Sequence, residues 1–255
     1  MAQPSNRRRF LARALGGAAA LTLAGCDRLS RTEWFPRLLD SAEWLSSGAQ
    51  HLITSRKSMA QEFSEADLSP QFRSNGTAKP NNPQYQASAA RAFADYRLEV
   101  TGLVERPAAF SLAALHELPS RTQITRHDCV EGWSAIGKWK GAKLSALLER
   151  VGPSPEARYV VFRCADPMDD QGTMYYESVD LEDAYHPQTI LAYQLNDAPL
   201  PIANGAPIRV RIERQLGYKM AKYIVGIELV ESFANIGGGK GGYWEDQGYQ
   251  WYAGI

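Results

Sequence analysis

The feature that most constrains the fold is a two-residue alternation of apolar and polar side chains, which recurs along the chain. It is clearest at 208–213, where isoleucine and valine alternate with arginine and glutamate, and it returns at 95–102. This period predicts strands with one face on the core and the other half-exposed. Apolar runs predict further strands at 159–164, 189–195 and 223–230. Strands with few helices between them, and without a regular strand–helix–strand repeat, indicate the α+β class.

The helical signals are fewer and shorter. In 141–151, leucine and valine recur at positions i, i+3, i+4 and i+7, which predicts a helix that a Gly-Pro pair ends. A short helix is predicted within 107–118, with Ser111 as a candidate N-cap, and another at 178–184. Apolar residues at helical spacing also predict an amphipathic helix at 34–45.

The first 26 residues are predicted to be an export signal that does not belong to the fold. The run NRRRFL at 6–11 resembles the twin-arginine signal, and a short alanine-rich apolar stretch follows it. The run LAGC at 23–26 resembles a lipobox, at which Cys26 would become lipidated. The alternative is an ordinary signal in which Cys26 occurs by chance. We therefore expect a periplasmic protein that is tethered to the inner membrane through Cys26.

Residues 27–78 are predicted to be a tether and an N-terminal arm that packs on the body, and residues 79–255 to be the functional domain. Part of 27–78 could instead dock a partner. The 255 residues suffice for one well-cored domain after a leader. The 28 basic and 28 acidic residues balance, so there is no overall basic field for nucleic acid. The predicted contact with the membrane is through the N-terminal lipid anchor alone.

The segment Arg126–Ser134 carries the strongest chemical signal, a cysteine among charged residues. Cys129 is flanked by arginine, histidine, aspartate and glutamate, whereas core cysteines usually lie among aliphatic residues. Such surroundings favour the thiolate, which binds metals or attacks electrophiles. The residues alone leave two alternatives open, a buried thiol without a ligand and a disulfide with Cys164.

The segment 126–133 (RHDCVEGW) resembles the cysteine segment of the sulfite oxidase-type molybdopterin-dependent oxidoreductase family. The likeness continues at 204–209 (NGAPIR) and 217–222 (GYKMAK), in the family's order, and covers about 78–255. It is closest to the branch of bacterial periplasmic methionine sulfoxide reductase catalytic subunits. The resemblance implies a mixed-sheet molybdopterin-binding fold in a single domain.

The resemblance also implies a molybdenum–molybdopterin cofactor and the residues that hold it. Cys129 would be the single protein ligand of molybdenum, because a soft thiolate suits such a centre, and pterin sulfurs and oxo groups would complete the shell. The match at 81–85 is loose, with a plain Asn-Pro turn as the alternative, and Cys164 could instead be a core strand residue. The residues implied to line the cofactor are Asn81, Asn82, Tyr85, Cys164, Asn204, Arg209, Met220, Ala221 and Lys222.

Basic residues gather within 209–222, and two of them, Arg209 and Arg211, share one strand face by the two-residue period. Guanidinium and ammonium groups both bind phosphate, which a pterin cofactor carries. The alternative is a solvated strand face. The members of this basic cluster are Arg209, Arg211, Arg214, Lys219 and Lys222.

His127 and Asp128 stand beside Cys129 and are candidates for the proton transfer that each oxygen-atom transfer requires. Either could simply be packed or exposed. Aromatic residues within 243–252 follow a glycine-rich loop at 237–242. They either pack in the core or shape a substrate or partner surface.

The resemblance implies oxygen-atom transfer at molybdenum, with reduction of a small-molecule or protein sulfoxide, methionine sulfoxide in particular. No haem or flavin motif is evident, so electrons are expected to pass through a membrane b-type haem protein or a periplasmic carrier. Sulfite oxidation is the alternative chemistry. Two other classes stay open: a lipoprotein binding module without redox chemistry, and a zinc hydrolase that uses Cys129 and His127.

Overall fold

The computed structural model describes residues 32, 34–35, 48, 55 and 58–255. The predicted signal at 1–26, with Cys26, and most of the predicted helix at 34–45 lie outside these residues. The chain divides into two units, Met1–Ile53 and Thr54–Ile255, and the second contains both sheets. Among the residues so described, no helix is long and apolar enough to cross a membrane.

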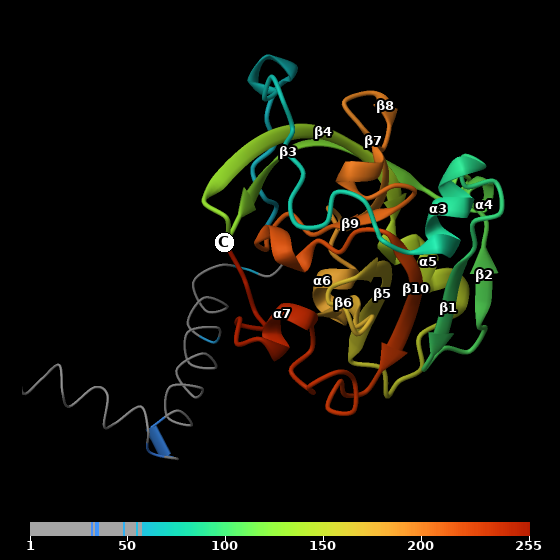
Figure 1. Cartoon of the computed structure of the whole chain (residues 1–255), viewed down its shortest axis with the longest axis vertical. Helices are drawn as coiled ribbons and strands as arrows, with labels where there is room; N and C mark the ends of the chain where they lie inside the picture. The colour runs from blue at the N-terminus through green and yellow to red at the C-terminus, as the bar shows by residue number, and fades with distance from the viewer. Residues whose placement is uncertain (1–31, 33, 36–47, 49–54, 56–57) are drawn as a thin grey trace, which may run out of the picture. The chain divides into compact units, whose positions relative to one another are not determined.

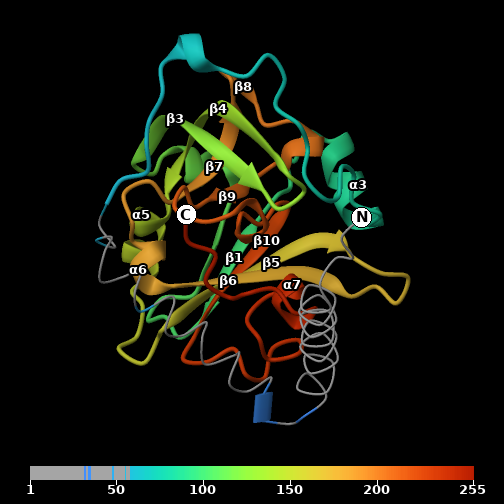
Figure 2. The same cartoon turned by 90° about the vertical axis from the view of Figure 1, so that its left-hand side faces the viewer.

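The first sheet is antiparallel and contains the longest strands of the described chain. Its path runs β3 (Ser120–Cys129), β4 (Trp133–Lys143), β7 (Ile190–Leu195) and β8 (Ala198–Pro199), and β9 (Arg209–Arg211) also pairs with β7. The β3–β4 hairpin curves over one side of the body (Figures 1 and 2). It carries Cys129 and Trp133 to its tip, where they pair.

The second sheet is mixed. Its order is β2 (Ala108–Phe110), β1 (Leu98–Gly102), β10 (Ile224–Val230), β5 (Tyr159–Pro167) and β6 (Met174–Asp180). The β1–β10 pair is parallel and the other pairs are antiparallel. Two sheets with short helices and one mixed sheet confirm the α+β prediction and the single functional domain.

The helices are short and begin later than the sequence pattern predicted. Residues 141–143 extend β4, 108–110 form β2, and 178–180 end β6, because pairing with a neighbouring strand satisfies their backbone groups. Ser111 caps its helix as predicted, since its hydroxyl accepts the N–H of Ala114. The helices are α3 (Pro83–Ala90), α4 (Leu112–His116), α5 (Leu144–Val151), α6 (Leu181–Ala184), α7 (Tyr243–Asp246) and the 3-10 turns η1 (Glu65–Asp67), η2 (Ile202–Asn204) and η3 (Gly217–Lys219).

The main core lies between the sheets and around α5. The predicted stripe of α5, formed by Leu144, Leu147, Leu148 and Val151, is fully buried in it. Burial of each such side chain stabilises a fold by roughly 1.5–3 kcal/mol. This one helix therefore fixes the two sheets against each other.

Residues 58–63 lie along the outer edge of β3, the last strand in the path of its sheet. Glu62 pairs with Thr125 as an antiparallel bridge. The Gln188 amide receives the N–H of Ala60 at 2.7 Å and donates to its carbonyl at 3.1 Å. Residues 62–63 thus extend the first sheet by backbone pairing, and the N–H of Phe63 donates to the Ile124 carbonyl at 2.9 Å.

Candidate active site

Cys129 ends β3 at a tight turn, and its carbonyl accepts the N–H of Gly132 at 3.0 Å. Beside it opens a cavity of about 170 Å³. Its walls come from distant parts of the chain, because the segment before α3, the end of β5, η3 and α7 converge there. The lining residues are Asn75, Gly76, Thr77, Cys129, Val130, Glu131, Asp166, Met168, Tyr175, Tyr218, Met220, Ala221, Lys222, Trp244 and Tyr249.

Lys222 fixes two of these walls to each other. Its Nζ donates to the carbonyls of Asn75 at 2.6 Å, Thr77 at 2.5 Å and Ala203 at 3.0 Å. Burial and the charge of Arg209 lower the pKa of Lys222 to about 7. Lys222 therefore holds the 75–77 segment against η2 instead of presenting its ammonium group to a phosphate.

Arg209 supports the Met220 wall from behind. Its guanidinium is fully buried and donates to the carbonyls of Asn204 at 3.1 Å and Met220 at 3.2 Å. Its Nε–H is buried without a partner. Gly205, at φ +113°, allows this packing, because a Cβ there would lie 3.0 Å from the Lys222 side chain.

The predicted half-exposed face at 208–213 is wrong. Arg211 is fully buried over the Trp139 ring and forms a two-pronged ion pair with Glu213 at 2.9 and 2.5 Å. The phosphate role of the basic cluster fails for this residue, since an internal carboxylate takes its guanidinium. A strand pattern cannot reveal such a partner, because its burial depends on Trp139 of another strand.

Lys219 is also taken by internal carboxylates. Its Nζ lies 2.6 Å from Glu177 and 2.5 Å from Glu245, and all three side chains are buried. Burial alone would lower the pKa of Lys219, but the two carboxylates outweigh it and raise that pKa. Burial raises the pKa of Glu177 well above its ordinary value, although Lys219 opposes the shift. This ion-pair cluster joins η3 to α7, and both elements line the cavity.

His127 lies behind the cavity wall. Its Nδ1 faces Arg211 Nη1 at 2.9 Å and Met220 Sδ at 3.3 Å. Because a guanidinium only donates, Nδ1 is the acceptor and the ring is neutral. Burial and Arg211 lower the pKa of His127 well below its ordinary value. A Cβ on Gly217 would lie 2.4 Å from its Nε2, so glycine is needed for this close packing.

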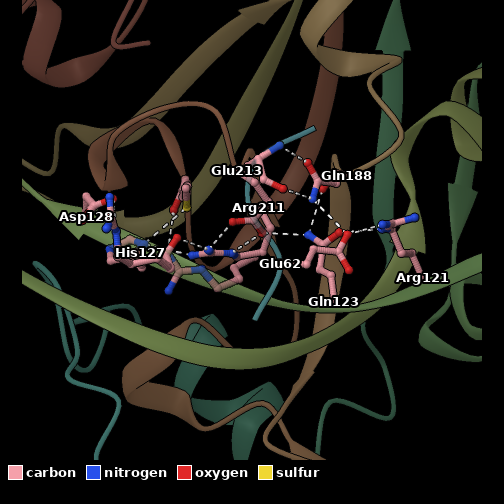
Figure 3. Close-up of polar contacts among 12 residues, drawn as sticks. Glu62, Arg121, Gln123, His127, Asp128, Gln188, Arg211 and Glu213 are labelled. Carbon is pink, nitrogen blue, oxygen red and sulfur yellow. Dashed lines mark hydrogen bonds and ion pairs between the residues drawn. The ribbon is translucent and has the colours of Figure 1, made fainter. Parts of the chain in front are cut away.

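A polar chain continues from His127 to the surface, as Figure 3 shows. From Arg211 it passes to Glu213, whose carboxylate accepts from Gln123 Nε2 at 2.7 Å. Gln123 accepts from Arg121 at 2.9 Å, and Arg121 pairs with Glu62 of the arm. The network fixes the His127 ring behind the cavity wall, and the predicted role of His127 in proton transfer stays a prediction.

Asp128 points away from Cys129, because successive side chains of a strand alternate between its faces. Its carboxylate accepts from Ser134 at 2.5 Å and Arg126 at 2.9 Å, and it lines a second cavity with Thr125. The structure therefore does not bring Asp128 to the Cys129 cavity, contrary to the prediction of a proton-transfer role.

The residues predicted around α3 lie at a third cavity. Asn82 is the N-cap of α3, and Tyr85 donates its hydroxyl to the Ala206 carbonyl at 2.6 Å. Both line this cavity together with the buried thiol of Cys164. Asn81 is exposed. Asn204 is buried, and its carbonyl accepts from Arg209. The structure therefore joins Cys129 with Met220, Ala221 and Lys222 in one cavity but not with these five residues.

Asp166 is a cavity residue that the sequence reasoning missed. It is 4% exposed, and its Oδ1 is buried without a hydrogen-bond partner. Burial raises the pKa of Asp166 to about 6. The available signal was spacing, since Asp166 follows Cys164 by two residues in an apolar strand.

We expect Asp166→Asn to stabilise the cofactor-free protein at neutral pH. The folded-state pKa lies above the unfolded value of 3.8, so the wild-type loses stability as pH rises from about 4 through about 6. The free energy of unfolding of the wild-type should fall by about 3 kcal/mol over this pH range, and that of the asparagine variant should not show this fall. Urea unfolding between pH 4 and 8 measures this, with exposed Asp170→Asn as the control. A parallel pH dependence in wild-type and Asp166→Asn would contradict the assignment.

Cys129 offers one soft ligand at the edge of the cavity. Burial raises the pKa of its thiol, contrary to the predicted thiolate, but a bound metal deprotonates a coordinating thiol outright. Cys129 and Cys164 are free thiols, so the disulfide alternative is wrong. Within the described residues, no three His, Cys, Asp or Glu side chains gather for a metal, which leaves the zinc alternative without its usual ligands.

Comparison with known proteins agrees with the resemblance. The profile of the family described as "Oxidoreductase molybdopterin binding domain" matches residues 85–235. The chain is 38% identical over 252 residues to the "Putative protein-methionine-sulfoxide reductase subunit YedZ1" of Azospira oryzae, covering 97% of this chain and 87% of that protein.

Two further relatives and one solved structure are also similar. The chain is 32% identical over 235 residues to "Protein-methionine-sulfoxide reductase catalytic subunit MsrP" of Burkholderia mallei, covering 89% of this chain and 70% of that one. It is 36% identical over 155 residues to the protein of that name in Xanthomonas axonopodis pv. citri. This match covers 57% of this chain and 48% of the Xanthomonas protein, so it spans about half the length of that relative. The sulfane dehydrogenase SoxCD structure from Paracoccus pantotrophus aligns with a TM-score of 0.49 at 22% identity, over 55% of this chain and 39% of that one.

The residues around the cavity fit a molybdopterin cofactor. The unpaired Oδ1 of Asn75, which lines the cavity, offers an acceptor to a pterin N–H. The Nε–H of Arg209 is also unpaired, but Arg209 lies behind the Met220 wall and is not among the lining residues. The Cys129 sulfur is the soft donor that molybdenum takes. The chain therefore belongs to the oxidoreductase molybdopterin binding domain family, and it is a molybdenum-dependent oxidoreductase with a molybdenum–molybdopterin cofactor.

Proposed function

We propose that the protein reduces sulfoxides, with methionine sulfoxide in proteins as the principal substrate. The observation that carries the proposal is the lining of the Cys129 cavity, which is mainly apolar and aromatic. Relatives that carry the name protein-methionine-sulfoxide reductase support it. A sulfoxide side chain is neutral, with an apolar methyl group and a polar oxygen, so it matches such a lining.

The charges of the cavity favour this substrate over sulfite. The charged lining residues are Glu131, Asp166 and Lys222. The ammonium group of Lys222 is held by backbone carbonyls, and Arg73, whose charge reaches Glu131, is not among the lining residues. No arginine is among the lining residues in the described part of the chain. Sulfite, an anion, would be repelled there, whereas a sulfoxide would not.

In the proposed mechanism, the chain's residues bind the cofactor and orient the substrate. Cys129 would be the protein ligand of molybdenum, Asn75 would contact the organic part of the cofactor, and Arg209 would support the Met220 wall from behind. The cofactor supplies the two electrons and accepts the oxygen atom. Tyr218, Trp244 and Tyr249 receive the methyl-sulfur end, because sulfur packs favourably against aromatic rings. The Tyr249 ring contacts both others: it lies edge-on to Tyr218 with ring centroids 5.2 Å apart, and tilted against Trp244 at 5.4 Å.

Electrons reach the protein from a separate carrier in this proposal, either a membrane b-type haem protein or a small periplasmic protein. The protein acts in the periplasm after twin-arginine export, tethered through lipidated Cys26. The sequence signals at 6–11 and 23–26 support this location. Labelling of cells with a radioactive fatty acid tests the anchor, since Cys26→Ser should abolish incorporation.

We expect Tyr249→Ala to raise KM for a peptide that contains methionine sulfoxide by about tenfold, which corresponds to roughly 1.4 kcal/mol of binding. Tyr249 is 41% exposed at the rim and contacts Trp244 and Tyr218, so its loss removes contact area without opening the core. Tyr185→Ala is the matched control, because Tyr185 is 39% exposed and does not line the cavity. Equal KM values in the two variants would refute the aromatic subsite.

The proposed function is tested with the molybdenum-loaded protein and two assays. One measures reduction of peptide methionine sulfoxide with a reduced viologen dye as the electron donor. The other measures sulfite oxidation with cytochrome c as the acceptor. Sulfoxide turnover that exceeds sulfite turnover supports the proposal, and the reverse ranking overturns it. No turnover in either assay, despite bound molybdenum, would favour the binding-module alternative.

A further inference from the structure

Asp166 places a carboxyl group with one unpaired oxygen in the wall of the Cys129 cavity. Burial raises its pKa, and hydrogen bonds to the backbone and to Thr77 oppose that shift. It stands near the end of β5, where the register with β6 shifts between Arg163 and Pro167. The side chain is 96% buried, since 4% is exposed, and the buried Oδ1 has no hydrogen-bond partner. A buried polar atom of this kind costs stability and requires an explanation. A ligand bound in the cavity would explain the unpaired oxygen, because Asp166 lines that cavity.

The charged neighbours do not neutralise Asp166. The Lys222 ammonium group lowers its pKa only as the weakest of the contributions, and burial dominates. The Nζ atom of Lys222 is engaged by three backbone carbonyls. The pKa of Asp166 is about 6, so a proton is available to it near neutral pH. The titratable groups that interact with Asp166 are Lys222, Cys164, Tyr85, Tyr175 and Tyr223.

The other acid groups near Cys129 are either occupied or outside the cavity lining. Nδ1 of His127 accepts from Arg211, and its Nε2 is buried without a partner against Gly217, but His127 does not line the cavity. Asp128 lies on the opposite face of β3 with Ser134 and Arg126. The two carboxylate oxygens of Glu131 accept from the Trp133 indole at 2.9 Å and the Gly76 N–H at 3.4 Å. Among the carboxylates that line the cavity, Asp166 is thus the one with an oxygen that no protein group takes.

The reaction of the proposed function consumes protons. A sulfoxide, two electrons and two protons give a thioether and water: the S–O bond breaks and two O–H bonds form. The electrons come from the reduced molybdenum cofactor, which the separate electron carrier reduces again. At least one proton must reach the departing oxygen inside the cavity. General acids that protonate a leaving oxygen typically accelerate reactions by about 10²–10⁴-fold.

We propose that Asp166 is the general acid of this reaction, with Oδ1 carrying a proton to the oxygen that leaves the sulfoxide. This inference rests on the proposed sulfoxide reductase function. Asp166 then regains its proton from solvent through the open mouth, beside exposed Val130 and Tyr249.

The test compares molybdenum-loaded wild-type, Asp166→Asn, Asp166→Glu and Asp170→Asn proteins. We expect the asparagine variant to lose about 100-fold in kcat/KM for methionine sulfoxide at pH 6 and to lack the wild-type fall in activity above about pH 6. The glutamate variant should recover part of both properties, and Asp170→Asn should match wild-type. Infrared difference spectra should show a carboxylic acid band that titrates near pH 6 in wild-type and is absent from Asp166→Asn.

Three results would overturn the inference. If Asp166→Asn keeps the wild-type rate and pH profile, the proton comes from elsewhere. If it loses its molybdenum, the residue holds the cofactor instead of donating a proton. If wild-type holoprotein reduces no sulfoxide, the proposed function fails and this inference fails with it, which the wild-type assay alone reveals.

Discussion

Cys129→Ser is expected to give a folded protein without sulfoxide reductase activity and without the electron paramagnetic resonance signal of a thiolate-bound molybdenum centre. Cys129 is partly exposed at the β3–β4 turn, so serine fits without a packing defect. A serine hydroxyl is a hard and weakly acidic donor that cannot replace a soft thiolate. Plasma mass spectrometry and the resonance spectrum of the purified protein measure the effect.

Cys164→Ser is the matched control for this prediction. Cys164 is the other free thiol of the described chain, and it is buried in β5 at a cavity distinct from that of Cys129. Burial raises the pKa of Cys164 well above its ordinary value, which is typical of an inert thiol. The control should keep its molybdenum signal. If Cys129→Ser kept activity while Cys164→Ser lost it, the assignment of the metal ligand would be wrong.

Lys219→Met is expected to destabilise the protein by about 3–5 kcal/mol at neutral pH, because it leaves two buried carboxyl groups without their cation. Lys219 contacts Glu177 and Glu245, and all three are buried. Lys240→Met, at an exposed lysine of the glycine-rich loop, should change stability by less than about 0.5 kcal/mol. Urea unfolding followed by tryptophan fluorescence gives the two values.

A compensating variant separates charge from packing. Lys219→Met combined with Glu177→Gln and Glu245→Gln removes the buried charges together, so it should recover much of the lost stability. If the triple variant is no more stable than Lys219→Met, loss of packing around Trp251, which lies 5.3 Å from the Lys219 ammonium, explains the effect instead.

Local pattern was enough to predict most strands and the buried stripe of α5. It was not enough for the ends of the elements, because residues such as Gly141 and Ser178 could continue either a strand or a helix until a neighbouring strand paired with them. The alternation at 208–213 predicted a solvated face for Arg209 and Arg211 for a similar reason, since it carries no information on their tertiary contacts. Only the folded chain brings Glu213 and Trp139 to Arg211, and their contacts offset the desolvation cost of burying its guanidinium.

The candidate site was predictable where the chemistry lies in a motif. Cys129 and the 220–222 segment were expected together, and they line one cavity. The tertiary arrangement decided the rest. His127 follows the motif but faces Arg211, and Asp128 turns away by strand alternation. Asp166 belongs to no sequence motif, and only the tertiary structure shows that it lines the cavity with an unpaired oxygen.

The pairing of residues 58–63 with β3 has a consequence for how shortened forms of the protein behave in solution. A strand edge with free N–H and C=O groups recruits other chains, and natural proteins cover such edges. The arm supplies that cover through the Glu62–Thr125 bridge and the Gln188 amide. A protein shortened to start at residue 79 would expose the unpaired backbone groups along the edge of β3, and we expect it to self-associate through that edge. A shortened protein that stays monomeric must therefore begin before Met59.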